Sequence, residues 1–66
     1  MSLKILRTDA DLNNAVLFRI PVNVISDGYL IEENVLIEGY NKFSVKVADG
    51  RFLRGNVQIL STVALL

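Results

Sequence analysis

Closely spaced turn signals divide most of this chain into segments that are too short for typical helices. Asp-Gly pairs stand at 27–28 and 49–50, and a Gly-Asn pair stands at 55–56. These pairs favour tight turns because glycine, asparagine and aspartate tolerate left-handed backbone conformations. The segments between them are rich in β-branched residues, and residues 43–48 alternate along the chain. Short segments of this kind predict antiparallel strands.

Five strands are expected after residue 17. The second is long enough to bend, and a turn is expected after it at residues 39–42. Pro21 cannot donate a ladder hydrogen bond, so it suits a strand start or a sheet edge. The alternation in the third strand places Phe43, Val45 and Val47 on one face. The predicted strands are Phe18–Ser26, Tyr29–Glu38, Phe43–Ala48, Arg51–Arg54 and Val57–Val63.

One short helix is expected before the strands, from about residue 9 to residue 17. Thr8 can cap it, and Asp11 stands at the capping-box spacing. Leu12, Ala15 and Val16 then form an apolar stripe at helical spacing. Residues 1–7 show no clear pattern and are expected to be extended or partly disordered.

The predicted fold is mainly β, in a single domain spanning residues 1–66. A short N-terminal helix precedes a five-stranded, strongly bent antiparallel sheet that closes or nearly closes into a small barrel. A monomer of this size buries only about 60% of the surface of its unfolded chain. Yet 52% of the residues are hydrophobic, and the mean hydropathy is +0.41. The excess of apolar residues predicts a subunit interface.

The sequence gives no sign of membrane insertion or of export. No apolar run approaches the roughly 20 residues of a membrane span. Charged residues interrupt the first eleven positions, so no signal peptide is evident. We therefore expect a soluble, cytoplasmic protein that makes no membrane contact.

Few side chains suited to catalysis are present. The chain has no His and no Cys, which excludes disulfides and thiolate or imidazole chemistry. It has no phosphate-binding loop and no dinucleotide fingerprint. Glu32 and Glu33 are adjacent in a predicted strand, so they point to opposite faces and form no acid–base pair. We predict that the protein is not an enzyme and uses no cofactor, metal or small-molecule substrate.

Positive charge is concentrated in one part of a chain whose formal net charge is zero. Lys42, Lys46, Arg51 and Arg54 fall within thirteen residues and are opposed there only by Asp49. A local basic zone suits a localised anion site. Ordinary solvated surface charge is the alternative interpretation of the same residues.

Two segments resemble the signatures of the Sm/Lsm family. The segment FLRGNVQI at 52–59 is similar to the second signature, an apolar strand followed by Arg-Gly, then Asn or Asp, then another apolar strand. The segment IEGYNKFSV at 37–45 stands where the first signature is expected, and its Gly39, Tyr40 and Phe43 fit. Asn41 replaces the usual Asp, and Val45 replaces the usual Asn.

Other segments resemble the bacterial, Hfq-like branch of the family. The segment RIPVNV at 19–24 is similar to the first strand of those proteins, including a proline after a short helix. Residues 40–43 resemble their aromatic turn, and residues 61–63 their closing strand. The Lys-His pair of that branch is replaced here by Arg54 and Gly55. In all, the resemblance covers residues 9–63.

The resemblance implies a homo-oligomeric ring of six or seven copies that binds single-stranded RNA. In such rings the fourth strand of one subunit pairs with the fifth strand of the next. Phe43 and Arg54 would sandwich a base, and Gly55 would allow its close approach. The expected RNA-binding residues are Phe43, Arg54, Gly55, Asn56, Asn41 and Lys42. Val45 lacks the amide that reads uracil in the family, which puts uridine specificity in doubt.

A second hypothesis assigns the same scaffold a structural or protein-interaction role without RNA binding. SH3-like barrels and Sm-like barrels both match the strand pattern, although the N-terminal helix favours the Sm-like barrel, and fold alone does not fix function. The neutral net charge and Val45 favour this alternative. It predicts an oligomer with no affinity for RNA at modest salt.

Overall fold

The computed structural model describes residues 3–48 and 50–64, which form seven strands and one helix. The turn predicted at 49–50 lies partly outside the described residues. The elements are β1 (Leu3–Ile5), α1 (Asp9–Leu17), β2 (Val22–Ser26), β3 (Tyr29–Val35), β4 (Ile37–Tyr40), β5 (Ser44–Val47), β6 (Gly50–Leu53) and β7 (Gln58–Ala64).

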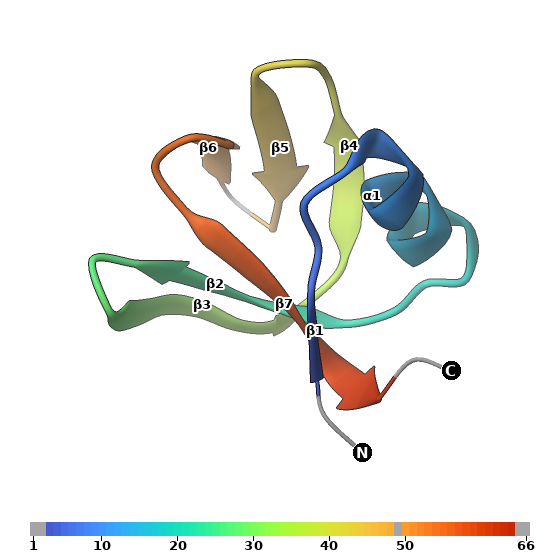
Figure 1. Ribbon diagram of the computed structural model, residues 1–66, viewed down its shortest axis with the longest axis horizontal. Helices are drawn as coiled ribbons and strands as arrows, with labels where there is room; N and C mark the ends of the chain where they lie inside the picture. Colours follow the sequence, from blue (N-terminus) through green and yellow to red (C-terminus); the bar gives the residue numbers. More distant parts are fainter. Residues whose placement is uncertain (1–2, 49, 65–66) are drawn as a thin grey trace.

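The strands form two antiparallel sheets (Figure 1). One has four strands in the order β1-β7-β2-β3, and the other has three in the order β4-β5-β6. A mainly β fold with one short helix and antiparallel pairing is therefore confirmed. The sequence predicted one bent five-stranded sheet, whereas the described residues form two sheets, and neither closes on itself.

The long second strand predicted at Tyr29–Glu38 accounts for most of this difference. It is present as β3 and β4, with Leu36 between them. Asn34 has a positive φ of 56°, and the pairing of β3 with β2 shifts register along its length. These irregularities bend the chain, so β3 joins the first sheet and β4 the second.

A strand that the sequence did not specify precedes the helix. β1 pairs with β7, with Leu3 opposite Ala64 and Ile5 opposite Leu60. The N–H of Leu6 continues this pairing by donating to the carbonyl of Ile59 at 2.7 Å. Because β2 pairs with the other side of β7, both sides of β7 are hydrogen-bonded within the chain.

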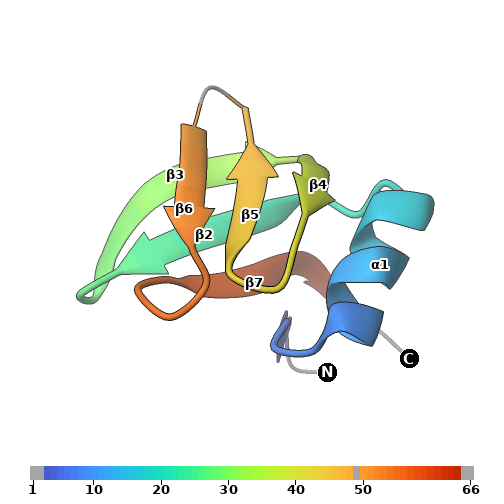
Figure 2. The same ribbon diagram turned by 90° about the horizontal axis from the view of Figure 1, so that it is seen from above.

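Helix α1 spans the residues that the sequence predicted. The Thr8 side chain accepts from the Asp11 N–H at 3.1 Å, and the Asp11 carboxylate accepts from the Thr8 N–H at 3.3 Å. This reciprocal pair is a capping box, which satisfies two backbone donors at the helix start. Leu12 and Ala15 are buried, and the helix packs beside β4 (Figure 2).

Both sheets and the helix share one hydrophobic core. Val22 and Val24 come from β2, Val45 and Val47 from β5, and all four side chains are fully buried. The remaining buried apolar residues are Leu6, Leu12, Ala15, Ile37 and Ile59.

The alternation predicted for residues 43–48 holds for the valines and fails at its start. Val45 and Val47 share the core face, but Phe43 is 70% exposed, while Ser44 is buried. The reason is that β5 begins only at Ser44, so Phe43 belongs to the preceding turn. The side chain of Phe43 therefore does not follow the alternation of the strand.

Candidate nucleic-acid interface

Two connecting segments that are distant in the sequence meet at one end of the molecule. The turn between β4 and β5 carries Asn41, Lys42 and Phe43, and the corner between β6 and β7 begins at Arg54. The Arg54 N–H donates to the Phe43 carbonyl at 2.8 Å and joins the two segments. The structure thus brings the six expected RNA-binding residues to neighbouring positions.

Asn41 organises the β4–β5 turn. Its side-chain oxygen accepts from the N–H groups of Phe43 and Ser44, both at 2.8 Å, and from the Ser44 hydroxyl at 3.2 Å. The Asn41 N–H donates to the Ser44 carbonyl at 2.9 Å. An asparagine oxygen that bonds to the following backbone is a common way to fix a turn. Asn41 therefore holds the backbone of Phe43 in place.

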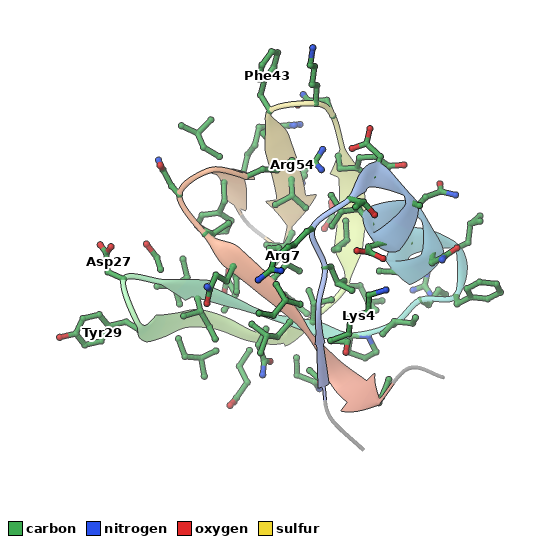
Figure 3. All side chains as sticks on the ribbon, viewed as in Figure 1. Lys4, Arg7, Asp27, Tyr29, Phe43 and Arg54 are labelled. Atoms are coloured by element: carbon green, nitrogen blue, oxygen red, sulfur yellow. The ribbon has the colours of Figure 1, made fainter. Side chains whose placement is uncertain are left out.

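Phe43 presents its ring to solvent from this turn. The ring points away from the body of the protein (Figure 3). The Lys42 ammonium lies 5.8 Å from the ring centroid, at the outer limit of a cation–π contact. An exposed aromatic ring beside a positive charge is a suitable surface for a nucleobase and its phosphate.

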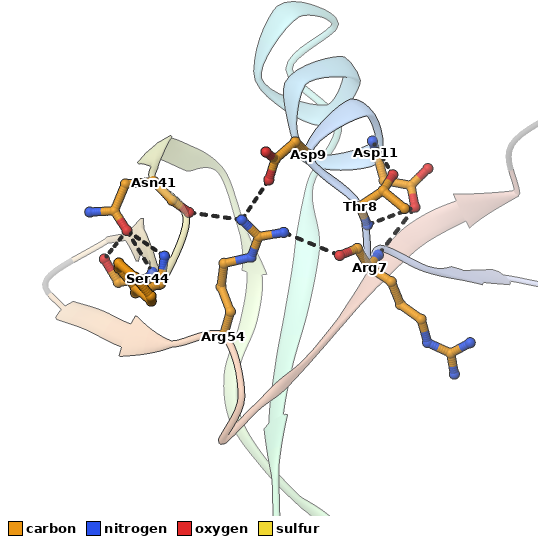
Figure 4. A network of polar contacts seen from close by, with 8 residues as sticks. Arg7, Thr8, Asp9, Asp11, Asn41, Ser44 and Arg54 are labelled. Atoms are coloured by element: carbon orange, nitrogen blue, oxygen red, sulfur yellow. Dashed lines mark hydrogen bonds and ion pairs between the residues drawn. The ribbon is translucent and has the colours of Figure 1, made fainter.

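Arg54 points in a different direction and is largely enclosed. Its guanidinium donates to Asp9 at 2.6 Å, to the Asn41 carbonyl at 2.8 Å and to the Arg7 carbonyl at 3.2 Å (Figure 4). Only 19% of its side chain is exposed. Arg54 therefore ties the start of α1 to the β4–β5 turn, and its guanidinium does not face the Phe43 ring within this chain.

Gly55 is required neither by the backbone nor by the packing around it. Its φ is not in the left-handed region, and a Cβ built on it meets no atom within 4 Å. Asn56, which follows, is exposed, and its carbonyl accepts from the Ser26 hydroxyl at 3.4 Å. The lack of a side chain at Gly55 leaves open space beside the corner.

Two hollows flank this corner. One, of about 250 Å³, is lined by Gly55, Gln58 and the β2–β3 turn among others. The other, of about 270 Å³, is lined by Arg7, Arg54 and Gln58 together with apolar side chains. Val57 and Gln58 line both hollows. Sequence reasoning missed Gln58 as a candidate, because a single exposed amide on a strand carries no distinctive pattern.

Val45 takes no part in this surface. Its side chain is fully buried in the core, opposite Phe52 on β6. The position that reads uracil in the resembled family therefore holds a packing residue in this protein.

Ion pairs neutralise much of the basic zone that the sequence suggested. Lys46 pairs with Glu38 at 2.8 Å, and Arg54 pairs with Asp9. Arg51 donates to the Ser44 hydroxyl at 3.1 Å. Within the part of the chain that the structure describes, Lys42 makes no ion pair, and its ammonium lies beside the Phe43 ring.

The carboxylate of Asp11 at the start of α1 has a lowered pKa. Its carboxylate pairs with the Lys4 ammonium at 2.8 Å and accepts from the backbone N–H groups of Arg7 and Thr8. The ion pair with Lys4, followed by these hydrogen bonds, holds the pKa of Asp11 well below its usual range. The Asp11 carboxylate thus fixes the segment that carries Arg7, and the carbonyl of Arg7 accepts a hydrogen bond from the Arg54 guanidinium.

Within residues 3–48 and 50–64, acidic side chains nowhere gather in groups of three that would hold a metal ion. No helix in this part of the chain has the length and apolar character to cross a membrane. Comparison of the chain with protein-family models, with curated proteins and with solved structures finds no match.

Proposed function

We propose that this protein is a self-associating, Sm-like small barrel that binds single-stranded RNA and has a non-catalytic role in RNA metabolism. The observation that carries the proposal is the exposed ring of Phe43 on a turn braced by Asn41. Assembly into a ring of six or seven copies would repeat this surface around one axis. Repetition would then supply affinity through avidity.

Stacking on Phe43 is the main source of binding energy in this proposal. A base stacked on an aromatic side chain contributes about 1–3 kcal/mol, and all four bases have a suitable face. The hydrogen bonds to Asn41 fix the turn backbone before RNA arrives, which lowers the entropy cost of binding. Lys42 beside the ring would meet the phosphate of the stacked nucleotide.

Arg54 has a supporting role in this proposal and does not form the second side of a base sandwich. Its guanidinium already holds Asp9 and two backbone carbonyls, so stacking would first require the loss of these contacts. The open space beside Gly55 would instead accommodate the sugar and phosphate that follow the stacked base.

A protein-interaction role without RNA is the second candidate. It is favoured by the large apolar side chains that remain exposed on so small a chain. These are Leu17, Phe18, Tyr29, Leu30, Ile31, Phe43, Leu53 and Val63. In that case Phe43 would contact a protein partner, and RNA would bind weakly or not at all.

The experiment compares Phe43→Ala with Phe18→Ala in titrations of labelled oligo-U and oligo-A. Phe18 is a matched control, because it is 71% exposed and lies at the far end of α1. We expect Phe43→Ala to weaken binding by about 1–3 kcal/mol for each base stacked, while Phe18→Ala has little effect. Equal affinities for wild type and both variants, or no binding by wild type, would contradict the proposal.

A further inference from the structure

Each sheet has two edge strands, β1 and β3 in the first sheet and β4 and β6 in the second. β3 is the last strand of the first sheet, and β6 is the last strand of the second. Each pairs on one side only within the described residues, with β2 and with β5 respectively. β7 differs because β1 and β2 cover its two sides. An open strand edge exposes unpaired N–H and C=O groups, which makes it a template for pairing with another chain.

The edge strand β3 exposes an unusual run of apolar side chains. Tyr29, Leu30 and Ile31 are consecutive, and each is exposed. The pairing of β3 with β2 shifts register between Leu30 and Glu32, so these side chains reach solvent without strict alternation. Figure 1 shows that β2 and β3 extend as an arm from the rest of the molecule, which leaves these side chains exposed. On β6, Leu53 is likewise 58% exposed.

The two edges carry opposite charges. β3 contains Glu32 and Glu33, and β6 contains Arg51. Glu32 lies opposite the buried Val24 and is half-buried, whereas its neighbours Ile31 and Glu33 are exposed. On β6, Phe52 lies opposite the buried Val45, so its neighbours Arg51 and Leu53 also point away from it.

We propose that β6 of one copy pairs antiparallel with β3 of a second copy, and that this contact builds the assembly. In one register Leu53 lies opposite Ile31 and Arg51 lies opposite Glu33. An apolar pair and an oppositely charged pair then lie close together along the contact, a combination that stabilises cross-strand pairing.

This inference rests on the self-association in the proposed function and changes its geometry. The family resemblance implies that β6 would pair with the last strand of a neighbour. In this structure β1 already occupies that side of β7, whereas β3 is open. A contact between two different edges is heterologous, so it closes into a ring or continues as a filament.

The test exchanges charges between the two edges and reads the solution mass by light scattering coupled to size exclusion. Arg51→Glu and Glu33→Arg each place like charges across the contact, so we expect each variant alone to run near 7.4 kDa. In an equimolar mixture, alternation of the two variants restores an opposite pair at every contact of a ring of six copies and at all but one contact of a ring of seven. We therefore expect the mixture to regain a mass near that of the wild type. Arg19→Glu is the control, because Arg19 is exposed beyond the end of α1 and outside both edges.

Recovery in the mixture also shows that both variants fold, so misfolding cannot imitate the expected result. Single variants that keep the wild-type mass, or a mixture that stays monomeric, would overturn the pairing of β3 with β6. A monomeric wild type would overturn it as well. RNA titration separates the two proposals, because an assembly that depends on this contact but binds no RNA would refute only the RNA-binding function.

Discussion

Phe43 and Arg54 are joined by a backbone hydrogen bond, yet their side chains have different environments. Phe43 is exposed and makes few contacts within the chain, whereas Arg54 connects three segments. The sequence placed both in one stacking site because the resembled signatures place them there. In the structure, Phe43 is a candidate ligand contact, whereas Arg54 holds the segments of this surface together.

Arg54→Ala should therefore lower stability. A hydrogen bond that involves a charged group contributes roughly 1.5–3 kcal/mol to stability. Asp9 is exposed, so water can hydrate its carboxylate once Arg54 is removed, and we expect the free energy of unfolding to fall by about 2 kcal/mol. The free energy of unfolding in urea measures this, with Arg19→Ala as an exposed control. A variant as stable as wild type would show that the Arg54 contacts contribute little.

Gly55→Ala should leave stability nearly unchanged and lower the affinity for RNA. A Cβ at this position meets no protein atom, so we expect the unfolding free energy to change by less than about 0.5 kcal/mol. RNA affinity should fall, because the methyl group enters the hollow beside the corner. Gly39→Ala is a matched control, since Gly39 also has free space around it but lies on β4, outside both corner hollows. Unchanged RNA binding by Gly55→Ala would remove this hollow from the site.

Single residues also show where sequence reasoning reaches its limit. The turn role of Asn41 could be predicted, because asparagine bonds locally to the backbone. The partners of Arg54 could not, because Asp9 is 45 residues away and only the tertiary fold brings it close. Likewise, alternation alone could not show that the strand starts one residue after Phe43.

At the scale of elements, local signals identified the helix and the β2–β3 turn correctly, whereas the turn expected at 39–42 begins only after Tyr40, where β4 ends. The capping box and the apolar stripe define α1, and the Asp-Gly pair at 27–28 forms the turn between β2 and β3. β1 was missed because three residues without alternation carry no strand signal, and their conformation depends on the distant β7. The bend between β3 and β4 was anticipated from length, but its position at Leu36 was not.

The start of α1 predicts a specific dependence of stability on pH. The pKa of Asp11 is lower in the folded chain than its usual value of 3.8. Its charged form therefore contributes stability above about pH 4, and this contribution is lost as the pH falls further. We expect the unfolding free energy to fall less steeply below pH 4 in Asp11→Asn than in wild type.

Urea unfolding at several pH values between 2 and 7 measures this effect. Asp27→Asn is the control, because Asp27 is exposed in the β2–β3 turn and asparagine tolerates its positive φ of 52°. Identical slopes for wild type and Asp11→Asn would show that the ion pair with Lys4 does not stabilise the fold.

At the scale of the whole molecule, one core joins two sheets and a helix, but much apolar surface remains outside it. Composition alone indicated this excess, since a chain of 66 residues has little interior. The structure shows where this exposed apolar surface lies: on β3, at the ends of α1, β6 and β7, and at Phe43 in the β4–β5 turn. Which strand edges are open could not be predicted from the sequence, because that depends on the unanticipated pairing of β1 with β7.

Both the avidity of RNA binding and the pairing of β6 with β3 depend on the assembly of several copies. The mass of the wild-type protein in solution, determined by light scattering coupled to size exclusion, tests it most directly. Six to seven copies of a 7.4 kDa chain correspond to about 44 to 52 kDa, which is the predicted result. A uniform species of 7.4 kDa at micromolar concentration would contradict the account and would favour a monomeric interaction module.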